Sequence, residues 1–368
     1  MTYESLFGGI YAGKTALVTG HSGFKGSWLA LWLEELGCRV IGYSLPAPTE
    51  PNHLGALSLR CTSLLGDIRD RSHLAAIVLE HRPDIVFHLA AQPLVRRSYR
   101  DPVETFETNV LGTVSVCEAC RAVDSVRAIV CVTSDKVYEN RECGWGYRET
   151  DTLGGHDPYS SSKACTELVA ACYRNSYFAR AEHGRTHDTL LATARAGNVI
   201  GGGDWAEDRL VPDLVKATTS DRPLLVRNPL SVRPWQHVLE PLSGYLLLGQ
   251  KLLRGETSFA EAWNFGPAEE GAVAVQSIVR QFCEVWPRVR YEMQPQAGAP
   301  HEAGLLKLDS SKAQRQMGWS PVWNWTDAVA TTAEWYSHFH EKGAVRTRRD
   351  LDDYIAAARR LNLSWSQA

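Results

Sequence analysis

Residues 14–26, KTALVTGHSGFKG, decide the fold, because a short apolar run passes here directly into a glycine-rich turn. The β-branched and apolar residues at 14–19 predict a buried strand, and apolar residues at helical spacing over 27–36 predict a helix after the turn. Gly20, Gly23 and Gly26 lie between the two. Glycine permits a positive φ and lets the backbone approach a pyrophosphate, and the following helix offers free N–H groups to phosphate. The stretch therefore predicts a dinucleotide-binding turn.

Beyond this turn, short apolar runs alternate with helical segments along the chain. Further strands are expected at 39–43, 64–68, 85–91, 128–133 and 190–195, and a helical region at 101–123. This alternation predicts an α/β fold with a doubly wound parallel (Rossmann) sheet and right-handed crossovers. The alternation lapses from about residue 199. The expected division is therefore a dinucleotide-binding domain over 1–198, to which later segments return, a smaller second lobe mainly over 199–345 and a peripheral helix and tail over 346–368.

Several residues near the expected strand ends suit a dinucleotide, since ligands in such sheets bind beyond the carboxyl ends of the strands. Asp67 is placed to reach an adenine, and the small Ala90 and Ala91 would let the backbone lie against the cofactor. Many dinucleotide folds carry an acid for the adenosine ribose after the second strand. Tyr43 and Ser44 stand there instead, so this position does not decide between NAD and NADP.

Tyr159 and Lys163 form the first group with catalytic chemistry. They are four residues apart, which on a helix puts both side chains on one face. A free tyrosine has a pKa of about 10, and a neighbouring ammonium is expected to lower it. The pair can then remove a proton from a hydroxyl while hydride leaves the same carbon. A surface tyrosine at the start of an ordinary helix is the alternative interpretation.

The second group with catalytic chemistry is Ser134, Asp135 and Lys136, directly after the expected strand at 128–133. Ser134 can hydrogen-bond a substrate hydroxyl, and Asp135 can act as an acid if it is kept protonated. Lys136 can act as a base if burial lowers its pKa, or as a cation beside an enolate. These roles conflict, because a charged Lys136 makes Asp135 a weaker proton donor. A plain turn with an exposed ion pair is the alternative.

Composition excludes several classes of protein. The 368 residues carry 39 basic and 42 acidic side chains, a net charge of −3 that gives no sign of a nucleic-acid partner. No apolar run reaches the roughly 18 residues that a membrane span needs. The nine cysteines are scattered, which predicts reduced thiols and a cytoplasmic location. Cys117 and Cys120 lie in a helical pattern without a second ligand pair, so no metal is expected.

With these residues in hand, the chain resembles the CDP-glucose 4,6-dehydratases, a family of extended short-chain dehydrogenase/reductases. The resemblance covers about residues 13–336, most of the chain. The motifs that narrow it to this family are HSGFKGSW at 21–28, TSDKVY at 133–138, GNVIGGGDW at 197–205 and RPWQHV at 233–238. The glycine turn and the Tyr159–Lys163 pair are shared by the whole superfamily and do not specify a substrate.

The resemblance implies a lyase that oxidises C4 of CDP-glucose with bound NAD, loses water across C5–C6 and returns hydride to C6. It implies that Asp135 is the acid for the 6-hydroxyl, and it places Lys136 where related dehydratases carry a glutamate as the C5 base. A homodimer or homotetramer is implied as well. The implied cofactor contacts are Gly20, Gly23, Phe24, Gly26, Asp67, Ile68, Ala90, Ala91, Asn109, Tyr159 and Lys163. The implied substrate contacts are Gln92, Asn198, Trp205, Arg209, Arg233 and His237.

Two other functions stay open at this point. A nucleotide-sugar epimerase or simple oxidoreductase of the same superfamily needs Tyr159 and Lys163, but it needs no acid and base for the loss of water. Asp135 and Lys136 discriminate between these enzymes and a dehydratase. A catalytically silent nucleotide-binding relative is the third possibility, and the full set of chemical groups argues against it.

Overall fold

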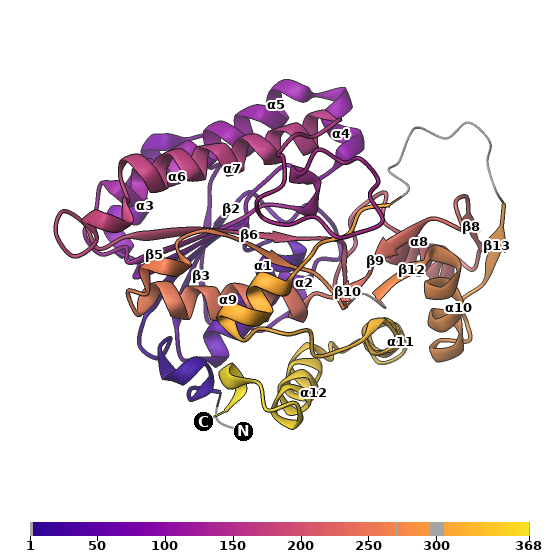
Figure 1. Cartoon of the computed structure of the whole chain (residues 1–368). Coiled ribbons are helices and arrows are strands. Elements are labelled where there is room, and N and C mark those ends of the chain that lie inside the picture. The colour runs from indigo at the N-terminus through magenta and orange to yellow at the C-terminus, as the bar shows by residue number, and fades with distance from the viewer. Residues whose placement is uncertain (1–2, 269–270, 295–304, 368) are drawn as a thin grey trace.

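A seven-stranded parallel sheet forms the centre of the molecule (Figure 1), and the predicted fold class is confirmed. The computed structural model describes residues 3–268, 271–294 and 305–367. The strand order is β11-β6-β5-β4-β1-β2-β3. The strands are β1 (Thr15–Thr19), β2 (Arg39–Ser44), β3 (Thr62–Leu65), β4 (Ile85–His88), β5 (Ala128–Val132), β6 (Leu190–Ala196) and β11 (Ala262–Phe265).

Helices cover both faces of this sheet. One face carries α3 (Arg71–His81), α6 (Gly112–Arg121) and α7 (Pro158–Ser176), drawn above the sheet in Figure 1. The other face carries α1 (Phe24–Glu35) and α9 (Leu239–Leu253), drawn below it. β1, β4, β5 and β6 are therefore buried on both sides, which accounts for their nearly continuous apolar sequence.

The topology reverses between β1 and β4, which are neighbours in the sheet. From β1 the chain proceeds outward to β2 and β3, and from β4 it proceeds outward on the other side to β5, β6 and β11. Such a switch point leaves a crevice at the carboxyl ends of the strands, where ligands bind. The glycine turn follows β1, and Ala90 and Ala91 follow β4, so the fold brings these predicted cofactor residues to that place.

Two expected elements differ in detail from the structure. β3 ends at Leu65, so Asp67 and Ile68 follow the strand instead of lying in it. The region 101–123 contains α5 (Pro102–Phe106), the π-helical turn η2 (Glu107–Leu111) and α6 in direct succession. A single π turn changes the direction of the side chains after it without ending the helix, so periodicity alone does not detect it.

A smaller lobe lies beside the sheet at the right of Figure 1. It contains the helices α8 (Leu210–Thr219) and α10 (Val275–Val285) and the short strand pairs β9 (Val232–Pro234) with β12 (Ala272–Ala274) and β8 (Leu224–Val226) with β13 (Tyr291–Met293). Between these segments, α9 and β11 return to the sheet domain. The exact division into domains stays a prediction.

The carboxyl-terminal segment is not peripheral, because it packs into the core. α11 (Trp325–Lys342) and α12 (Thr347–Arg360) contribute buried side chains, and Trp365 stacks on Phe7 with 5.1 Å between ring centroids. Glu240 of α9 accepts the backbone N–H groups of residues 322 and 323 at 2.9 and 2.7 Å, and the Tyr354 hydroxyl at 2.8 Å. This buried carboxyl holds the last helices against the sheet domain.

Within the described residues, no helix has both the length and the apolar character of a membrane span. Cys117, Cys120 and Cys131 are buried, and burial raises the pKa of each thiol, to about 12 for Cys120 and Cys131. These cysteines are therefore poor nucleophiles and poor metal ligands, because both roles require the thiolate.

Candidate active site

The surrounding protein restricts a side chain differently at each of the three glycines of the turn. Gly20 has φ of 77°, and a Cβ there would lie 2.7 Å from the backbone nitrogen of Ala90. A Cβ on Gly26 would lie 2.1 Å from the carbonyl oxygen of Gly20, so only glycine lets α1 begin this close to β1. Gly23 has φ −77° and ψ 169°, which any residue adopts, and its nearest protein atom would be 3.3 Å from a Cβ.

The protein itself therefore requires glycine at Gly20 and Gly26, whereas a Cβ at Gly23 would need a shift of only a few tenths of an ångström. Close approach of a ligand to the backbone is the remaining reason for the middle glycine. Gly23 is also the N-cap of α1 and makes no side-chain cap, so the first N–H groups of the helix stay available to an anion. Phe24 begins the helix directly beyond. The local geometry thus fits the diphosphate of a dinucleotide.

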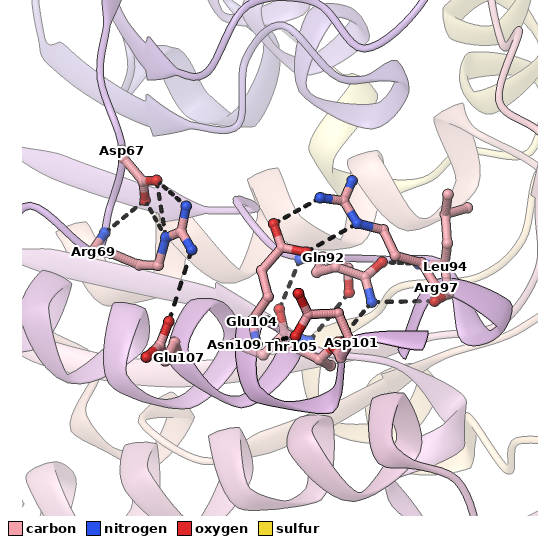
Figure 2. Close-up of polar contacts among 10 residues, drawn as sticks. All are labelled: Asp67, Arg69, Gln92, Leu94, Arg97, Asp101, Glu104, Thr105, Glu107 and Asn109. Carbon is pink, nitrogen blue, oxygen red and sulfur yellow. Dashed lines mark hydrogen bonds and ion pairs between the residues drawn. The ribbon is translucent and has the colours of Figure 1, made fainter. Parts of the chain in front are cut away.

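Asn109 organises the loop after β4, and Figure 2 shows its contacts with Gln92. Its side-chain oxygen accepts the Gln92 N–H at 2.8 Å, and its amide nitrogen donates to the Gln92 carbonyl and to the Ser162 hydroxyl. The π turn η2 places Asn109 at this position. The amide is fully used by the protein, which favours a role in positioning the half-buried Ala90 and Ala91 over the predicted direct cofactor contact.

Gln92 likewise makes internal contacts. Its amide nitrogen donates to the hydroxyl of Thr105 at 2.9 Å and to the carbonyl of Leu94 at 3.2 Å. Its oxygen accepts the Leu94 N–H at 2.7 Å. The side chain is buried and occupied, so the geometry does not favour the predicted sugar contact.

Asp67 follows β3, and its carboxylate binds Arg69 at 2.6 Å (Figure 2). The Arg69 guanidinium holds the pKa of Asp67 below its usual value, so the side chain is an anion that accepts hydrogen bonds. Ile68 is buried next to it and packs against Gly112, where a Cβ would lie 2.5 Å from its terminal methyl. Both placements are compatible with the predicted adenine contact, which stays a prediction.

Tyr159 and Lys163 lie in the first turns of α7, as their spacing predicts. Asp157 caps this helix by accepting the Ser160 N–H at 3.0 Å, and Pro158 occupies the first position. Both side chains are buried against the ends of β5 and β6. The Lys163 ammonium donates to the carbonyl of Val132 at 3.1 Å, at the last residue of β5. Burial lowers the pKa of Lys163.

The expected lowering of the Tyr159 pKa by Lys163 is wrong for this chain by itself. Burial raises the pKa of Tyr159 to about 12. A hydrogen bond from Ser134 and the charge of Arg209 act to lower it, and the charge of Asp135 raises it further. Desolvation of the phenolate therefore outweighs the nearby cations, and a bound ligand that adds positive charge or donors has to supply the rest.

The Ser134–Lys136 group lies where the sequence predicts, at the carboxyl end of β5. Ser134 caps the short η3 (Asp135–Val137) and donates to the Asp135 carboxylate at 2.9 Å. Asp135 is buried, with one oxygen near the backbone of Gly197. Lys136 is half-buried. Ser134, Asp135 and Tyr159 thus form one cluster of two hydroxyls and a carboxyl.

A buried ion pair lies beneath this cluster and was not predicted from the sequence. Arg195 of β6 donates to Glu167 of α7 at 2.8 Å, and Thr133 and Thr193 donate to the same carboxylate at 2.5 and 2.7 Å. Burial raises the pKa of Glu167, but Arg195 and the hydroxyls outweigh it, so the net pKa is lowered and the carboxylate is charged. Glu167 is four residues after Lys163, the spacing that could have indicated it.

The substrate residues fall into two groups. Asn198 follows β6 and is half-buried, Arg209 binds Asp204 at 2.8 Å, and Arg233 lies on β9 and donates to the carbonyl of Val232. The charge of Arg209 also reaches the Tyr159 hydroxyl. Amide and guanidinium groups suit a phosphate-bearing ligand, so the predicted diphosphate contacts of Asn198, Arg209 and Arg233 stay predictions.

His237 belongs to the core, contrary to the prediction of a substrate contact, whereas Trp205 is half-buried and its substrate contact stays a prediction. His237 is 0% exposed, packs edge-on against the rings of Trp28 and Trp323, and burial lowers its pKa to about 3. Trp205 packs against Trp335, Tyr336 and Phe339 of α11. A sequence motif does not distinguish a packed aromatic from one that faces a ligand.

Together these residues provide a phenol, an alcohol, a carboxyl and several cations at the dinucleotide crevice. The phenol and the alcohol suit proton exchange with a substrate hydroxyl beside hydride transfer. The buried carboxyl adds a second proton donor or acceptor a short distance away. Within the described residues no group of three or more metal-ligating side chains occurs.

Comparisons with known proteins agree with this geometry. The family described as GDP-mannose 4,6 dehydratase matches residues 17–332. A CDP-glucose 4,6-dehydratase of Salmonella typhimurium is 48% identical, with 95% of this chain and 98% of the relative covered. A dTDP-glucose 4,6-dehydratase of Xanthomonas campestris is 28% identical over 88% of this chain and 93% of its own. The structure of MoeE5 in complex with UDP-glucose and NAD superposes with a TM-score of 0.71 at 26% identity, covering 92% and 99% of the two chains.

The different requirements at Gly23 and Gly26 give a paired prediction. Gly26→Ala forces its Cβ against a backbone carbonyl, and such overpacking costs about 1–3 kcal/mol, so in a chain of 368 residues the thermal midpoint should fall by roughly 1–4 °C. Gly23→Ala should shift the midpoint by less than Gly26→Ala does but weaken NAD binding at least about tenfold. Calorimetry and NAD titration measure the two effects. Normal NAD affinity in Gly23→Ala would show that no ligand approaches this backbone.

Proposed function

The chain belongs to the GDP-mannose 4,6 dehydratase family, and we propose that it converts CDP-glucose to CDP-4-dehydro-6-deoxyglucose and water with bound NAD. The observation that carries the proposal is the buried Asp135 beside Ser134 and Tyr159. An epimerase or simple oxidoreductase has no need of a second acid next to the phenol. The 48% identity to a CDP-glucose 4,6-dehydratase supports this substrate over other nucleotide sugars.

The cofactor fits the residues that are present. Gly23 leaves the approach to the amino end of α1 clear, and Ala90 carries the small side chain that the crevice needs beside it. MoeE5, a structural neighbour, binds NAD together with a nucleotide sugar. When bound, NAD supplies the redox chemistry, by accepting hydride from C4 and returning it to C6. Gly20, Gly23 and Gly26 would hold its diphosphate, and Asp67 its adenosine.

The first half of the proposed reaction uses Tyr159. Its phenolate accepts the proton of the 4-hydroxyl as the C4–H bond breaks, and the neighbouring Ser134 hydroxyl holds the same substrate oxygen. Lys163 stays anchored to Val132 and contributes positive charge near the phenol. The resulting 4-ketone makes the C5 proton acidic.

The second half of the reaction uses the residues of η3. A base removes the C5 proton, Asp135 gives its proton to the departing 6-hydroxyl, and water leaves. Once C6 is reduced, the base returns a proton to C5, and Asp135 regains its proton from the medium. We assign the base to Lys136, since it is adjacent to the acid and half-buried. No net oxidation occurs, so the enzyme is a lyase.

Incubation with CDP-glucose in deuterated water tests the whole proposal. The expected product is the CDP-linked 4-keto-6-deoxy sugar with one deuterium at C5, and no reduced cofactor accumulates. Mass spectrometry and proton NMR measure both. A 4-epimer of CDP-glucose, or stoichiometric formation of reduced nicotinamide, would contradict the dehydratase reaction.

Lys136→Met tests the base. The variant should bind CDP-glucose within about threefold of the wild type, but form product about 10²- to 10⁴-fold more slowly, the usual contribution of a general base. Oxidation at C4 needs no C5 base, so reduced cofactor should build up transiently, which absorbance detects. Lys216→Met, at an exposed site on α8, removes the same charge and serves as the control. Normal turnover by Lys136→Met would exclude Lys136 as the base.

The oligomeric state is part of the proposal as well. Helices α5 and α7 and the π turn η2 pack together and expose large apolar side chains. These are Val103, Phe106, Leu111 and Leu168, each more than a third exposed. Such a surface fits self-association across a two-fold axis. We therefore propose a homodimer through these helices, and the scattered free thiols keep the cytoplasm as the predicted compartment.

Leu168→Glu should convert the dimer to monomer, because it places a charge in the centre of the apolar contact. Light scattering at micromolar concentration measures the mass. Leu230→Glu, at a 74% exposed site in the smaller lobe, should leave the dimer intact. A wild-type monomer, or a Leu168→Glu dimer, would contradict this interface.

A further inference from the structure

Both ends of the turn 134–136 are attached to one buried ion pair. Thr133 precedes the turn, and its hydroxyl donates to the Glu167 carboxylate at 2.5 Å. Tyr138 lies just after the turn, and its hydroxyl accepts a hydrogen bond from the Arg195 guanidinium at 2.8 Å. Arg195 and Glu167 bind each other at 2.8 Å, and their side chains are 4% and 2% exposed. The proposed acid and base therefore lie on a segment whose two ends reach the same pair of side chains.

Further contacts hold the Tyr138 end of the turn in one place. The Arg195 guanidinium lies over the Tyr138 ring, 5.0 Å from its centroid. The Tyr138 hydroxyl donates to the side-chain oxygen of Asn264 at 2.8 Å. Asn264 in turn donates to the carbonyl oxygens of Tyr147 and Asp309 at 2.8 and 3.1 Å. Tyr138 is 1% exposed, and its hydroxyl has both a donor and an acceptor, so its position is well defined.

The same ion pair also fixes the helix that carries the phenol. Tyr159, Lys163 and Glu167 follow one another at intervals of four residues, so their side chains lie along one face of α7. Lys163 donates to the carbonyl of Val132 at 3.1 Å, and Glu167 accepts the hydroxyl of the next residue, Thr133. The helix is therefore attached to the end of β5 at two successive residues. These attachments set the position of the phenol relative to the acid and the base.

We propose that Glu167 and Arg195 are positioning residues for the loss of water, which hold the turn 134–136 in a fixed place beside the Tyr159 phenol. The inference rests on the proposed function and names the residues that align its two halves. The phenol acts at C4, whereas the acid and the base act at C6 and C5, so one bound hexose has to reach all three groups. Misplacement of a reacting group by about 1 Å can lower a rate about 100-fold, so this attachment contributes directly to the rate.

Stability alone does not account for the arrangement. Desolvation offsets most of the attraction within a buried ion pair, so packed apolar side chains would hold the elements together as well. The pair instead makes directional bonds at two places in the chain, with Thr133 before the turn and with Tyr138 after it. Thr193 of β6 donates to the same carboxylate at 2.7 Å, but it does not adjoin the turn. The two threonines therefore separate a positioning role from a structural one.

Thr133→Val and Thr193→Val each remove one hydroxyl from Glu167 with little change in the shape of the side chain. Both should lower the thermal midpoint, but only Thr133→Val releases the turn. We expect its kcat to fall about 10- to 100-fold with KM within about threefold of the wild type, whereas Thr193→Val keeps kcat within about threefold. Thr133→Ser, which retains the hydroxyl, should restore kcat. Equal losses of kcat in the two valine variants would reduce the ion pair to a structural role and overturn the proposal.

Tyr138→Phe tests the other end of the turn. It removes the hydrogen bond from Arg195, so kcat should fall at least about tenfold while KM stays within about threefold of the wild type. Because the phenol of α7 stays in place, reduced cofactor should build up transiently, which absorbance detects. Tyr147→Phe is the matched control, since the Tyr147 ring stacks on Tyr138 but its hydroxyl binds residues 140 and 141. A wild-type kcat in Tyr138→Phe would contradict the inference.

Hydrogen exchange of residues 134–138, followed by mass spectrometry, needs no substrate and separates this inference from the proposed function. Exchange should be at least about tenfold faster in Thr133→Val and Tyr138→Phe than in the wild type, and unchanged in Thr193→Val and Tyr147→Phe. Unchanged exchange in the first two variants would refute the attachment, whatever the reaction is. If exchange responds as expected but the wild type forms no 4-keto product from CDP-glucose, the proposed function fails while the attachment stands.

Discussion

The buried ion pair between Glu167 and Arg195 is the interaction on which the active site depends. It joins α7 to β6, and the hydroxyl of Thr133 brings β5 into the same carboxylate. Buried ion pairs contribute little net stability, because desolvation offsets the attraction, but breaking one leaves an unpaired buried charge. The pair therefore acts mainly as a constraint on register. It fixes the face of α7 that carries Tyr159 and Lys163 against the strand ends that carry Ser134 and Asp135.

Positive charge at this constrained site shapes its chemistry. Lys163 lies one helical turn after Tyr159, and the charge of Arg209 also reaches the phenol; of these two cations only Arg209 has a carboxylate partner within ion-pair distance among the described residues. Cations in a buried site are stabilised by an anion, so we expect the diphosphate of a nucleotide sugar to make this arrangement of charges favourable. The raised pKa of Tyr159 has a related cause. Burial keeps the phenol protonated, and we expect a bound ligand to lower this pKa by adding positive charge or hydrogen-bond donors.

Features that depend on residues close together in the sequence could be predicted, whereas contacts between distant elements could not. The turn at Gly20 and the spacing of Tyr159 and Lys163 are local, so the sheet, the crevice and the catalytic pair were predictable from the sequence. Glu167 and Arg195 lie on different elements, so their pairing needed the fold. The misassigned His237 shows the opposite error, since a histidine in a specific motif proved to be a neutral core side chain. Asn109 positions the loop after β4 by binding the Gln92 backbone, and it lies in a π turn that periodicity does not reveal.

The same scaffold serves epimerases and dehydratases, so the difference between them has to lie in a few side chains at the sheet edge. Proton abstraction beside hydride transfer needs only the α7 face. Loss of water also needs an acid and a base on the hexose and a fixed orientation of its C5–C6 bond. Asp135 and Lys136 come from the end of β5, next to the face of α7 that carries Tyr159. Under the proposed function, one short turn at the end of a strand therefore adds the acid and the base that distinguish a dehydratase from an epimerase, without any change in the sheet.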